Sequence, residues 1–189
     1  MEVGPKRVYQ FRIDLKGIRP PIWRRILVPE EYSFWDLHIA IQDAMGWSGY
    51  HLHEFEVSCP PHGLKVRIGI PDEEFAKGEI LPGWEEMIAD YFSARRSVGL
   101  YVYDFGDNWE HVLRLEKILP REDSTRYPVC IAGRRACPPE DCGGVWGYEE
   151  LLRGEGEAQE YYEDFDPECF DVEEVVFRDP HKVPRWADN

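Results

Sequence analysis

The chain has 189 residues, a formal net charge of −15, a hydrophobic content of 43% and an aromatic content of 14%. This composition excludes a disordered protein, and the length suits one domain with a sizeable core. The negative charge disfavours general binding to nucleic acid, because it repels a phosphate backbone.

The first residues contain no apolar signal core, and no run of 18 apolar residues occurs in the chain. The sequence therefore predicts a cytoplasmic protein without a membrane segment. Five cysteines are present, and none lies in a C-x-x-C pair. In a reducing compartment we expect them to be free thiols rather than a disulfide framework.

Two strands are expected near the start of the chain. Residues 8–15 alternate apolar and polar side chains, which predicts a half-buried strand. Gly17 and the two prolines that follow break it, and residues 22–28 predict a second strand, antiparallel to the first. Its Arg24 and Arg25 are expected to cover apolar surface with their stems and to pair with carboxylates.

A helix is predicted over residues 34–45. Ser33 and Asp36 together resemble a capping box, with aspartate in the place of glutamate. Apolar side chains follow at helical spacing, and Gly46 is suited to end the helix in a left-handed conformation.

The middle of the chain returns to strands. Residues 51–57 alternate and predict a third strand, and residues 66–70 predict a short one. Residues 71–83 are acidic and irregular, and apolar spacing over residues 84–92 indicates a second helix.

A hairpin is predicted over residues 98–118, around a polar turn that contains a Gly-Asp pair. The expected register pairs Asp104 with Trp109 and Val102 with His111. It places Asp104 and His111 on one face as diagonal neighbours, roughly 7–8 Å apart.

The last third of the chain differs in character. Residues 128–148 are rich in cysteine, proline and glycine and predict an irregular loop, followed by a short helix over residues 148–153. Residues 149–174 hold twelve acidic residues and only Arg153 as a base.

The order of these elements predicts an α+β fold with a mixed or antiparallel sheet and helices on one face. A β-grasp-like core is expected over residues 1–120. Residues 121–189 are expected to form an irregular acidic lobe that packs on this core within a single structural domain.

Several runs together resemble the plasmid pRiA4b ORF-3-like family. They are PIWRR at 21–25, MGW at 45–47, HLHEF at 51–55, YDFGDNWEH at 103–111, CPPEDCGG at 137–144 and GY at 147–148. The resemblance covers about residues 7–178. It implies no established activity and supplies no catalytic residue. Some members carry a resolvase label, but this chain lacks the basic arm and the serine among arginines that a serine resolvase needs.

One candidate polar site combines His51, His53, Asp104, Asp107 and His111. Imidazole and carboxylate suit zinc, manganese or iron, so His51, His53, Asp107 and His111 are metal candidates. An aspartate that holds a histidine suits acid–base chemistry, so His53, Asp104 and His111 are catalytic candidates. The alternative is that His53 and His111 are buried histidines satisfied by Asp104 or by a backbone carbonyl.

Cys130, Cys137 and Cys142 form a weaker metal candidate. Their spacing is not that of a zinc ribbon, although a histidine could complete a Cys₃His site. The alternatives are a packed loop with buried thiols and a disulfide between Cys137 and Cys142.

Four tryptophans, Trp23, Trp47, Trp109 and Trp146, lie beside glycines, prolines or polar turns. They could line a cleft or a peptide groove, but rings of this kind more commonly pack in a core.

The favoured function is a non-catalytic binding or interaction module whose acidic C-terminal lobe faces a partner such as a basic protein. One alternative is a metal-assisted hydrolase or nuclease-like enzyme that uses the His/Asp cluster and a divalent metal. A DNA-associated factor, the third possibility, is disfavoured by the net charge.

Overall fold

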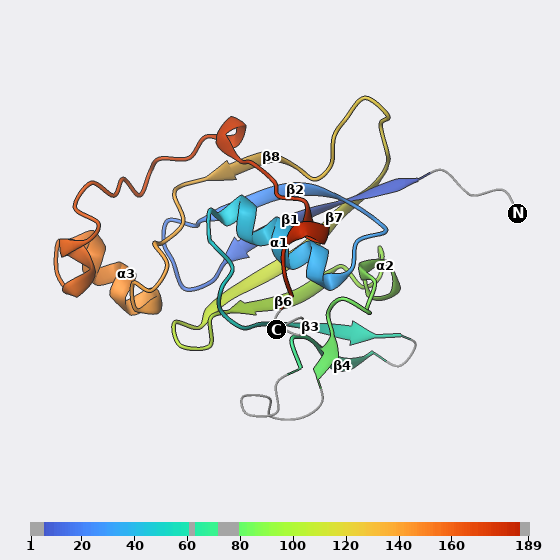
Figure 1. Cartoon of the computed structure of the whole chain (residues 1–189), viewed down its shortest axis with the longest axis horizontal. Helices are drawn as coiled ribbons and strands as arrows, with labels where there is room; N and C mark the ends of the chain where they lie inside the picture. The colour runs from blue at the N-terminus through green and yellow to red at the C-terminus, as the bar shows by residue number, and fades with distance from the viewer. Residues whose placement is uncertain (1–5, 61–62, 72–79, 186–189) are drawn as a thin grey trace, which may run out of the picture.

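The computed structural model describes residues 6–60, 63–71 and 80–185 (Figure 1). The strands are β1 (Arg7–Leu15), β2 (Trp23–Pro29), β3 (His53–Cys59), β4 (Leu64–Gly69), β5 (Ile80–Pro82), β6 (Val98–Tyr103), β7 (Trp109–Pro120) and β8 (Val129–Arg134). The α-helices are α1 (Phe34–Met45), α2 (Ile88–Tyr91) and α3 (Gly144–Arg153). Three short 3₁₀-helices follow: η1 (Glu157–Glu160), η2 (Val172–Glu174) and η3 (Pro180–Lys182).

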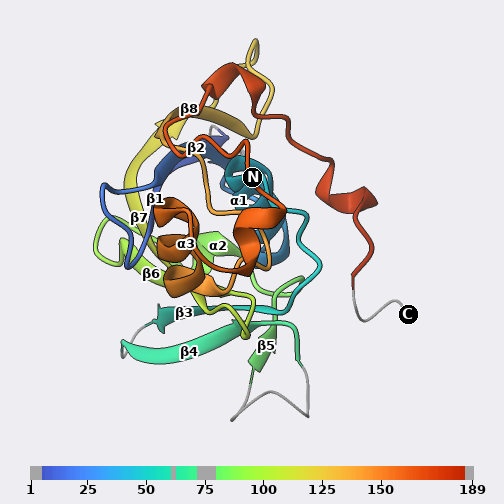
Figure 2. The ribbon, with the colours of Figure 1, turned by 90° about the vertical axis from the view of Figure 1, so that its left-hand side faces the viewer.

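The strands form one sheet in the order β5-β4-β3-β6-β7-β1-β2-β8. Neighbouring strands are antiparallel except for β4 and β5, which are parallel. The sheet curves around α1, which lies inside the curve, and α3 lies at one end of the molecule (Figures 1 and 2). The predicted α+β class with a mixed sheet is therefore confirmed.

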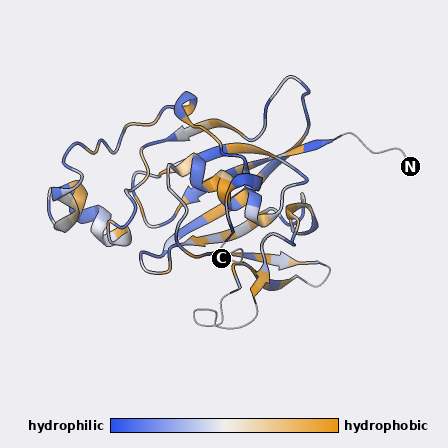
Figure 3. Ribbon diagram, in the orientation of Figure 1, coloured by the Kyte–Doolittle hydropathy of each residue, from blue (hydrophilic) through white to orange (hydrophobic). Residues whose placement is uncertain are grey.

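The predicted first hairpin is confirmed, since β1 and β2 pair antiparallel from Val8 opposite Pro29 to Asp14 opposite Trp23. Hydrophobic and hydrophilic residues are interspersed along the strands (Figure 3). Every second side chain is buried along β2, β3 and the first part of β7, as in a strand with a single core-facing side.

The predicted α1 is also confirmed, with both of its ends. Ser33 accepts a hydrogen bond from the Asp36 amide, and the Asp36 side chain accepts one from the Ser33 amide, which completes the capping box. Gly46 ends the helix with a φ of 86°, a left-handed conformation that glycine adopts without a steric cost.

Replacing Ser33 with alanine is expected to lower the free energy of unfolding by about 1 kcal/mol, the usual value of an N-cap side chain. The change leaves the Asp36 amide without its side-chain acceptor. Chemical denaturation followed by tryptophan fluorescence measures the effect. Ser33→Thr keeps a hydroxyl that accepts from the Asp36 amide and donates to the Asp36 carboxylate, and it should recover most of the loss. A Ser33→Ala variant as stable as wild type would contradict the capping role.

Four predicted segments differ from the structure. The second helix is a single turn, Ile88–Tyr91, and α3 begins at Gly144 rather than at Tyr148. The segment predicted to be an irregular loop contains β8, which pairs with β2. This strand forms because β2 offers it a free edge, a long-range contact that leaves no clear period in the sequence. Residues 71–83 were also predicted to be irregular, but they include the strand β5 at Ile80–Pro82, which pairs with β4. Residues 72–79 of this segment lie outside the described residues.

The predicted register of the β6–β7 hairpin is wrong. Tyr103 pairs with Trp109 and Tyr101 pairs with His111, so that residues 104–108 form the loop. Asp104 and Asn108 have φ values of 57° and 55°, and the Asn108 amide donates to the Asp104 carbonyl. The odd loop length shifts the pairing by one residue, which moves Tyr101 and Tyr103 to the buried face and takes Asp104 out of the strand.

Residues after position 120 pack against the rest of the sheet and helices. Cys130, Cys137, Tyr148 and Leu151 belong to the same hydrophobic core as the side chains of β1 and α1. After α3 the chain returns past β8 at η2 and past α1 at η3 (Figure 1). No helix among the described residues is long and apolar enough to cross a membrane.

Candidate functional site

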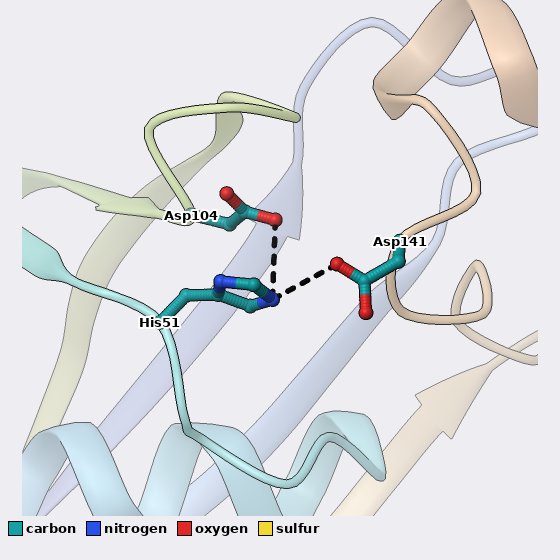
Figure 4. A group of neighbouring side chains, drawn as sticks. All are labelled: His51, Asp104 and Asp141. Carbon is teal, nitrogen blue, oxygen red and sulfur yellow. Dashed lines mark hydrogen bonds and ion pairs between the residues drawn. The ribbon is translucent and has the colours of Figure 1, made fainter.

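Three loops meet near one end of the sheet and bring His51, Asp104 and Asp141 together (Figure 4). His51 precedes β3, Asp104 follows β6, and Asp141 precedes α3. His51 Nε2 lies 3.0 Å from Asp141 Oδ1 and 3.6 Å from Asp104 Oδ2. One possible ligand atom from each residue lies within 4.8 Å of the other two. We call these residues the His51 cluster.

The position of Asp104 follows from the turn that it begins. Its amide donates to the Leu52 carbonyl at 2.9 Å, which ties the hairpin to the segment that carries His51. Its Oδ1 accepts the amide of Gly106 at 2.9 Å and that of Asp107 at 3.4 Å. These two hydrogen bonds turn Asp104 Oδ2 toward His51. Only 7% of the Asp104 surface is exposed.

The loop that carries Asp141 is held by hydrogen bonds of Asp141 and of the preceding residue, Glu140. Its Oδ2 accepts the Tyr50 hydroxyl at 2.7 Å, and this hydrogen bond to a carboxylate raises the pKa of Tyr50 and keeps the phenol protonated. The neighbouring Glu140 accepts the Ser48 amide and the Tyr103 hydroxyl. The loop therefore cannot move without breaking hydrogen bonds to the segment before β3.

The first turn of α3 packs closely against the same loop. A Cβ atom at Gly147 would lie 1.9 Å from the Cys142 carbonyl oxygen, so the contact requires glycine. Asp141 has a φ of 58° and Asp104 one of 57°. Aspartate tolerates this left-handed conformation better than most residues, at a cost of about 1 kcal/mol each.

The predicted catalytic histidines lie in the core. His53 is 1% exposed and His111 is 0% exposed. Burial lowers the pKa of His53 to about 3 and that of His111 to about 4. His111 Nδ1 lies 3.3 Å from the Tyr101 carbonyl oxygen, which agrees with the alternative of a buried histidine satisfied by a backbone carbonyl. Neither ring nitrogen of His53 has a hydrogen-bond partner among the described residues.

His53 stacks on a second buried histidine, His38 of α1, with ring centroids 3.6 Å apart. Within the described chain, no ion pair or hydrogen bond joins Asp104 to His53 or to His111. Among the described residues, His51 and Asp104 are therefore the predicted histidine and aspartate whose side chains the structure brings together.

The remaining metal candidates lie elsewhere. Asp107 Oδ2 accepts the Gly143 amide at 3.2 Å and so braces the loop of Asp141. Cys130, Cys137 and Cys142 are free and buried, and none joins a three-ligand group within the described residues. Burial raises the pKa of Cys137 to about 11 and that of Cys142 to about 12, so both thiols stay protonated at neutral pH. This geometry agrees with the alternative of a packed loop.

Asp141 is the residue that sequence patterns do not single out. It lies 90 positions after His51, and nothing in the local spacing connects the two. The available signal is that all three cluster residues fall within runs that carry the family resemblance, at 51–55, 103–111 and 137–144.

A groove opens beside Asp141, between α3 and the segment that follows it. We call it the α3 groove; its volume is about 630 Å³. Its lining includes Asp141, Trp146, Glu150, Ala158, Tyr161 and Tyr162. Trp146 is 68% exposed and Tyr161 is 80% exposed, and the residues that line the groove include no lysine, arginine or histidine.

Comparisons with known proteins agree with the resemblance in the sequence. The chain is 36% identical over 148 residues, 76% of its length and 71% of the relative's, to "Uncharacterized protein y4hQ" of Sinorhizobium fredii. The crystal structure of the protein of unknown function MM3350 from Methanosarcina mazei Go1 superposes with a TM-score of 0.82 at 48% identity, covering 91% of this chain and 99% of that one. The family described as "Plasmid pRiA4b ORF-3-like protein" matches residues 7–174, and the chain belongs to this family.

Proposed function

We propose that this protein is a binding module that takes a cationic segment of a partner protein in the α3 groove. The observation that carries the proposal is the lining of the groove. Exposed rings of Trp146 and Tyr161 stand beside the carboxylates of Asp141 and Glu150, without a basic side chain in the lining.

The chemistry of this lining suits lysine and arginine. A cation over the face of an aromatic ring gains about 0.5–2 kcal/mol, with tryptophan the best partner. A nearby carboxylate adds a charge-assisted hydrogen bond. Large rings that are left exposed beside polar groups are also typical of interaction surfaces.

The charge around the groove supports the same occupant. Residues 149–174 hold twelve acidic residues and one base, so the field near α3 is strongly negative. Such a field attracts a basic segment from a distance of about a Debye length, ~8–10 Å at physiological salt, and speeds its association. The same field repels a phosphate backbone, which weakens the proposal of a DNA-associated factor.

A metal-assisted enzyme built on His53, Asp104 and His111 has less support. The two histidines are buried in the core, where a substrate does not reach them. General acid–base catalysis needs a group within hydrogen-bond reach of the substrate.

Fluorescence anisotropy with labelled peptides tests the binding proposal. We expect a lysine- and arginine-rich peptide to bind and an acidic peptide of equal length not to bind. Affinity should fall as salt rises, because the attraction is partly screened. Trp146→Ala and Glu150→Lys should each weaken binding by about tenfold or more, the effect of 1.4 kcal/mol.

Two matched variants control for unspecific effects. Leu64→Ala removes another exposed apolar side chain, and Glu85→Lys reverses another exposed charge, both away from the α3 groove. Both should bind the basic peptide as wild type does. Equal affinity of wild type and the Trp146→Ala variant, with both folded by thermal melting, would refute the proposal.

A further inference from the structure

We propose that His51, Asp104 and Asp141 bind one divalent transition-metal ion, through the imidazole Nε2 and one oxygen from each carboxylate. This inference goes beyond the proposed binding of a basic segment and does not depend on it. It concerns a different chemistry at the edge of the α3 groove, with which it shares only Asp141.

The spacing of the three side chains fits such an ion. Zinc bonds to histidine nitrogen and carboxylate oxygen are about 2.0–2.2 Å long, so neighbouring ligand atoms in a tetrahedral or octahedral site lie about 3.0–3.5 Å apart. The separations from His51 Nε2 are 3.0 Å to Asp141 Oδ1 and 3.6 Å to Asp104 Oδ2. The three side chains also point toward one common position in Figure 4.

The Asp104 carboxylate supplies an independent observation. The residue is 7% exposed, and its two turn hydrogen bonds both go to Oδ1. Oδ2 accepts no hydrogen bond from any described residue, and its separation of 3.6 Å from His51 Nε2 is too long for one. An oxygen of a largely buried carboxylate gains little from so long a contact to an imidazole, and a cation in the His51 cluster would bind it directly.

The local charge favours a cation as well. In the described part of the chain, the ion pairs of Asp104 and Asp141 involve His51 alone and neither lysine nor arginine. Two carboxylates that share one imidazole repel each other, and a divalent ion placed between them would remove this repulsion.

Surrounding hydrogen bonds hold the ligands in place. The Tyr50 hydroxyl donates to Asp141 Oδ2, and the Gly106 amide donates to Asp104 Oδ1. In each carboxylate, this hydrogen bond is made by the oxygen that does not face His51. The bond therefore fixes the orientation of the second oxygen, which faces His51. Outer contacts of this kind typically contribute to metal affinity.

The ligand set identifies the class of metal. One imidazole and two carboxylates suit Zn²⁺, Mn²⁺ or Fe²⁺ better than Cu⁺, which prefers sulfur, or Ca²⁺, which prefers an all-oxygen shell. The Asp141 side chain is 58% exposed and that of His51 is 28% exposed, so solvent reaches the cluster. Three protein ligands in contact with solvent leave coordination positions for water.

Isothermal titration of the full-length, chelator-treated protein with ZnCl₂ and MnCl₂ tests the inference. We expect one ion per chain and a higher melting temperature in its presence. His51→Gln and Asp141→Asn should each weaken affinity by about tenfold or more. Asp141 is exposed, so its variant is expected to fold even if a change at Asp104 does not.

Three further measurements make the result specific. Asp164→Asn removes an exposed carboxylate outside the cluster and should bind as wild type does. Trp146→Ala should also keep the metal, so that failure of metal binding and failure of peptide binding are told apart. With Co²⁺ as the probe, a thiolate charge-transfer band would place the ion on cysteines and overturn the assignment, as would affinity that the His51 and Asp141 variants leave unchanged.

Discussion

Acidification from about pH 6.5 to about pH 5 is expected to destabilise the fold steeply, because histidines buried in the core are held uncharged. Burial lowers the pKa of His53 to about 3 and that of His111 to about 4. Burial also places the pKa of His38 well below its ordinary value, and His53 beside it lowers it further. These side chains are 0–1% exposed, so solvent does not screen the effect.

The direction of the effect follows from the proton balance. In the unfolded chain each histidine binds a proton near pH 6.5, whereas in the folded chain it does so only at a much lower pH. The contribution to stability is therefore complete above about pH 6.5 and is lost as the pH falls toward the folded-state pKa. Each histidine removes about 1.4 kcal/mol per pH unit, so the three together remove on the order of 5 kcal/mol by about pH 5. Total stabilities of about 5–15 kcal/mol make this a large fraction.

Urea denaturation at stepwise pH values measures the slope. His53→Phe should reduce it by the share of one histidine, about 1.4 kcal/mol per pH unit. His181→Gln is the matched control, since His181 is exposed and should leave the slope unchanged. A stability that stays flat down to about pH 5, where most carboxylates are still ionised, would show that these histidines are not buried in neutral form.

Replacing Arg24 with methionine is expected to cost about 3–5 kcal/mol of stability, because three carbonyl oxygens lose a charged donor at about 1–3 kcal/mol each. Arg24 is 2% exposed and lies at the centre of the contacts that join β2, α1 and β8. Its guanidinium donates to the carbonyl oxygens of Ala44 at 2.8 Å, Trp23 at 3.0 Å and Arg134 at 3.1 Å. It also lies 3.8 Å from the centre of the Phe170 ring.

The sequence predicted pairing with carboxylates for both Arg24 and Arg25. Arg25 does pair with Glu116, at 2.6 Å, whereas the recorded hydrogen bonds of Arg24 go to carbonyl oxygens and to the Cys137 sulfur. Methionine can replace the apolar stem of Arg24 but donates nothing, so the buried carbonyl oxygens lose their partner.

Chemical denaturation compares Arg24→Met with Arg25→Met, which removes a partly exposed ion pair and should cost about 1 kcal/mol or less. Arg24→Lys keeps the charge without the planar fork and should fall between the two. If Arg24→Met is no more destabilising than Arg25→Met, the central role of this side chain is wrong.

Local chemistry explains which elements could be predicted from the sequence. The capping pair Ser33 and Asp36, with Gly46 at the other end, specifies α1 through contacts within a few residues. Alternation specifies β1 and β2 for the same reason, since one side of each strand faces the core. The strand β8 forms by pairing with the edge of β2, which lies more than 100 residues earlier in the chain. No local sequence pattern predicts this strand.

In the candidate site too, local patterns predicted some features and long-range contacts determined the others. Residue patterns and motifs were enough to predict the α+β class, the family and a set of candidate histidines and aspartates. Which of these side chains meet depends on contacts between distant segments. An odd loop with left-handed residues at Asp104 and Asn108 sets the hairpin register, which pairs His111 with Tyr101 and takes Asp104 out of the strand. Asp141 lies beside His51 because its loop is hydrogen-bonded to segments far away in the sequence. The spacing of residues along the chain does not predict contacts between such distant segments.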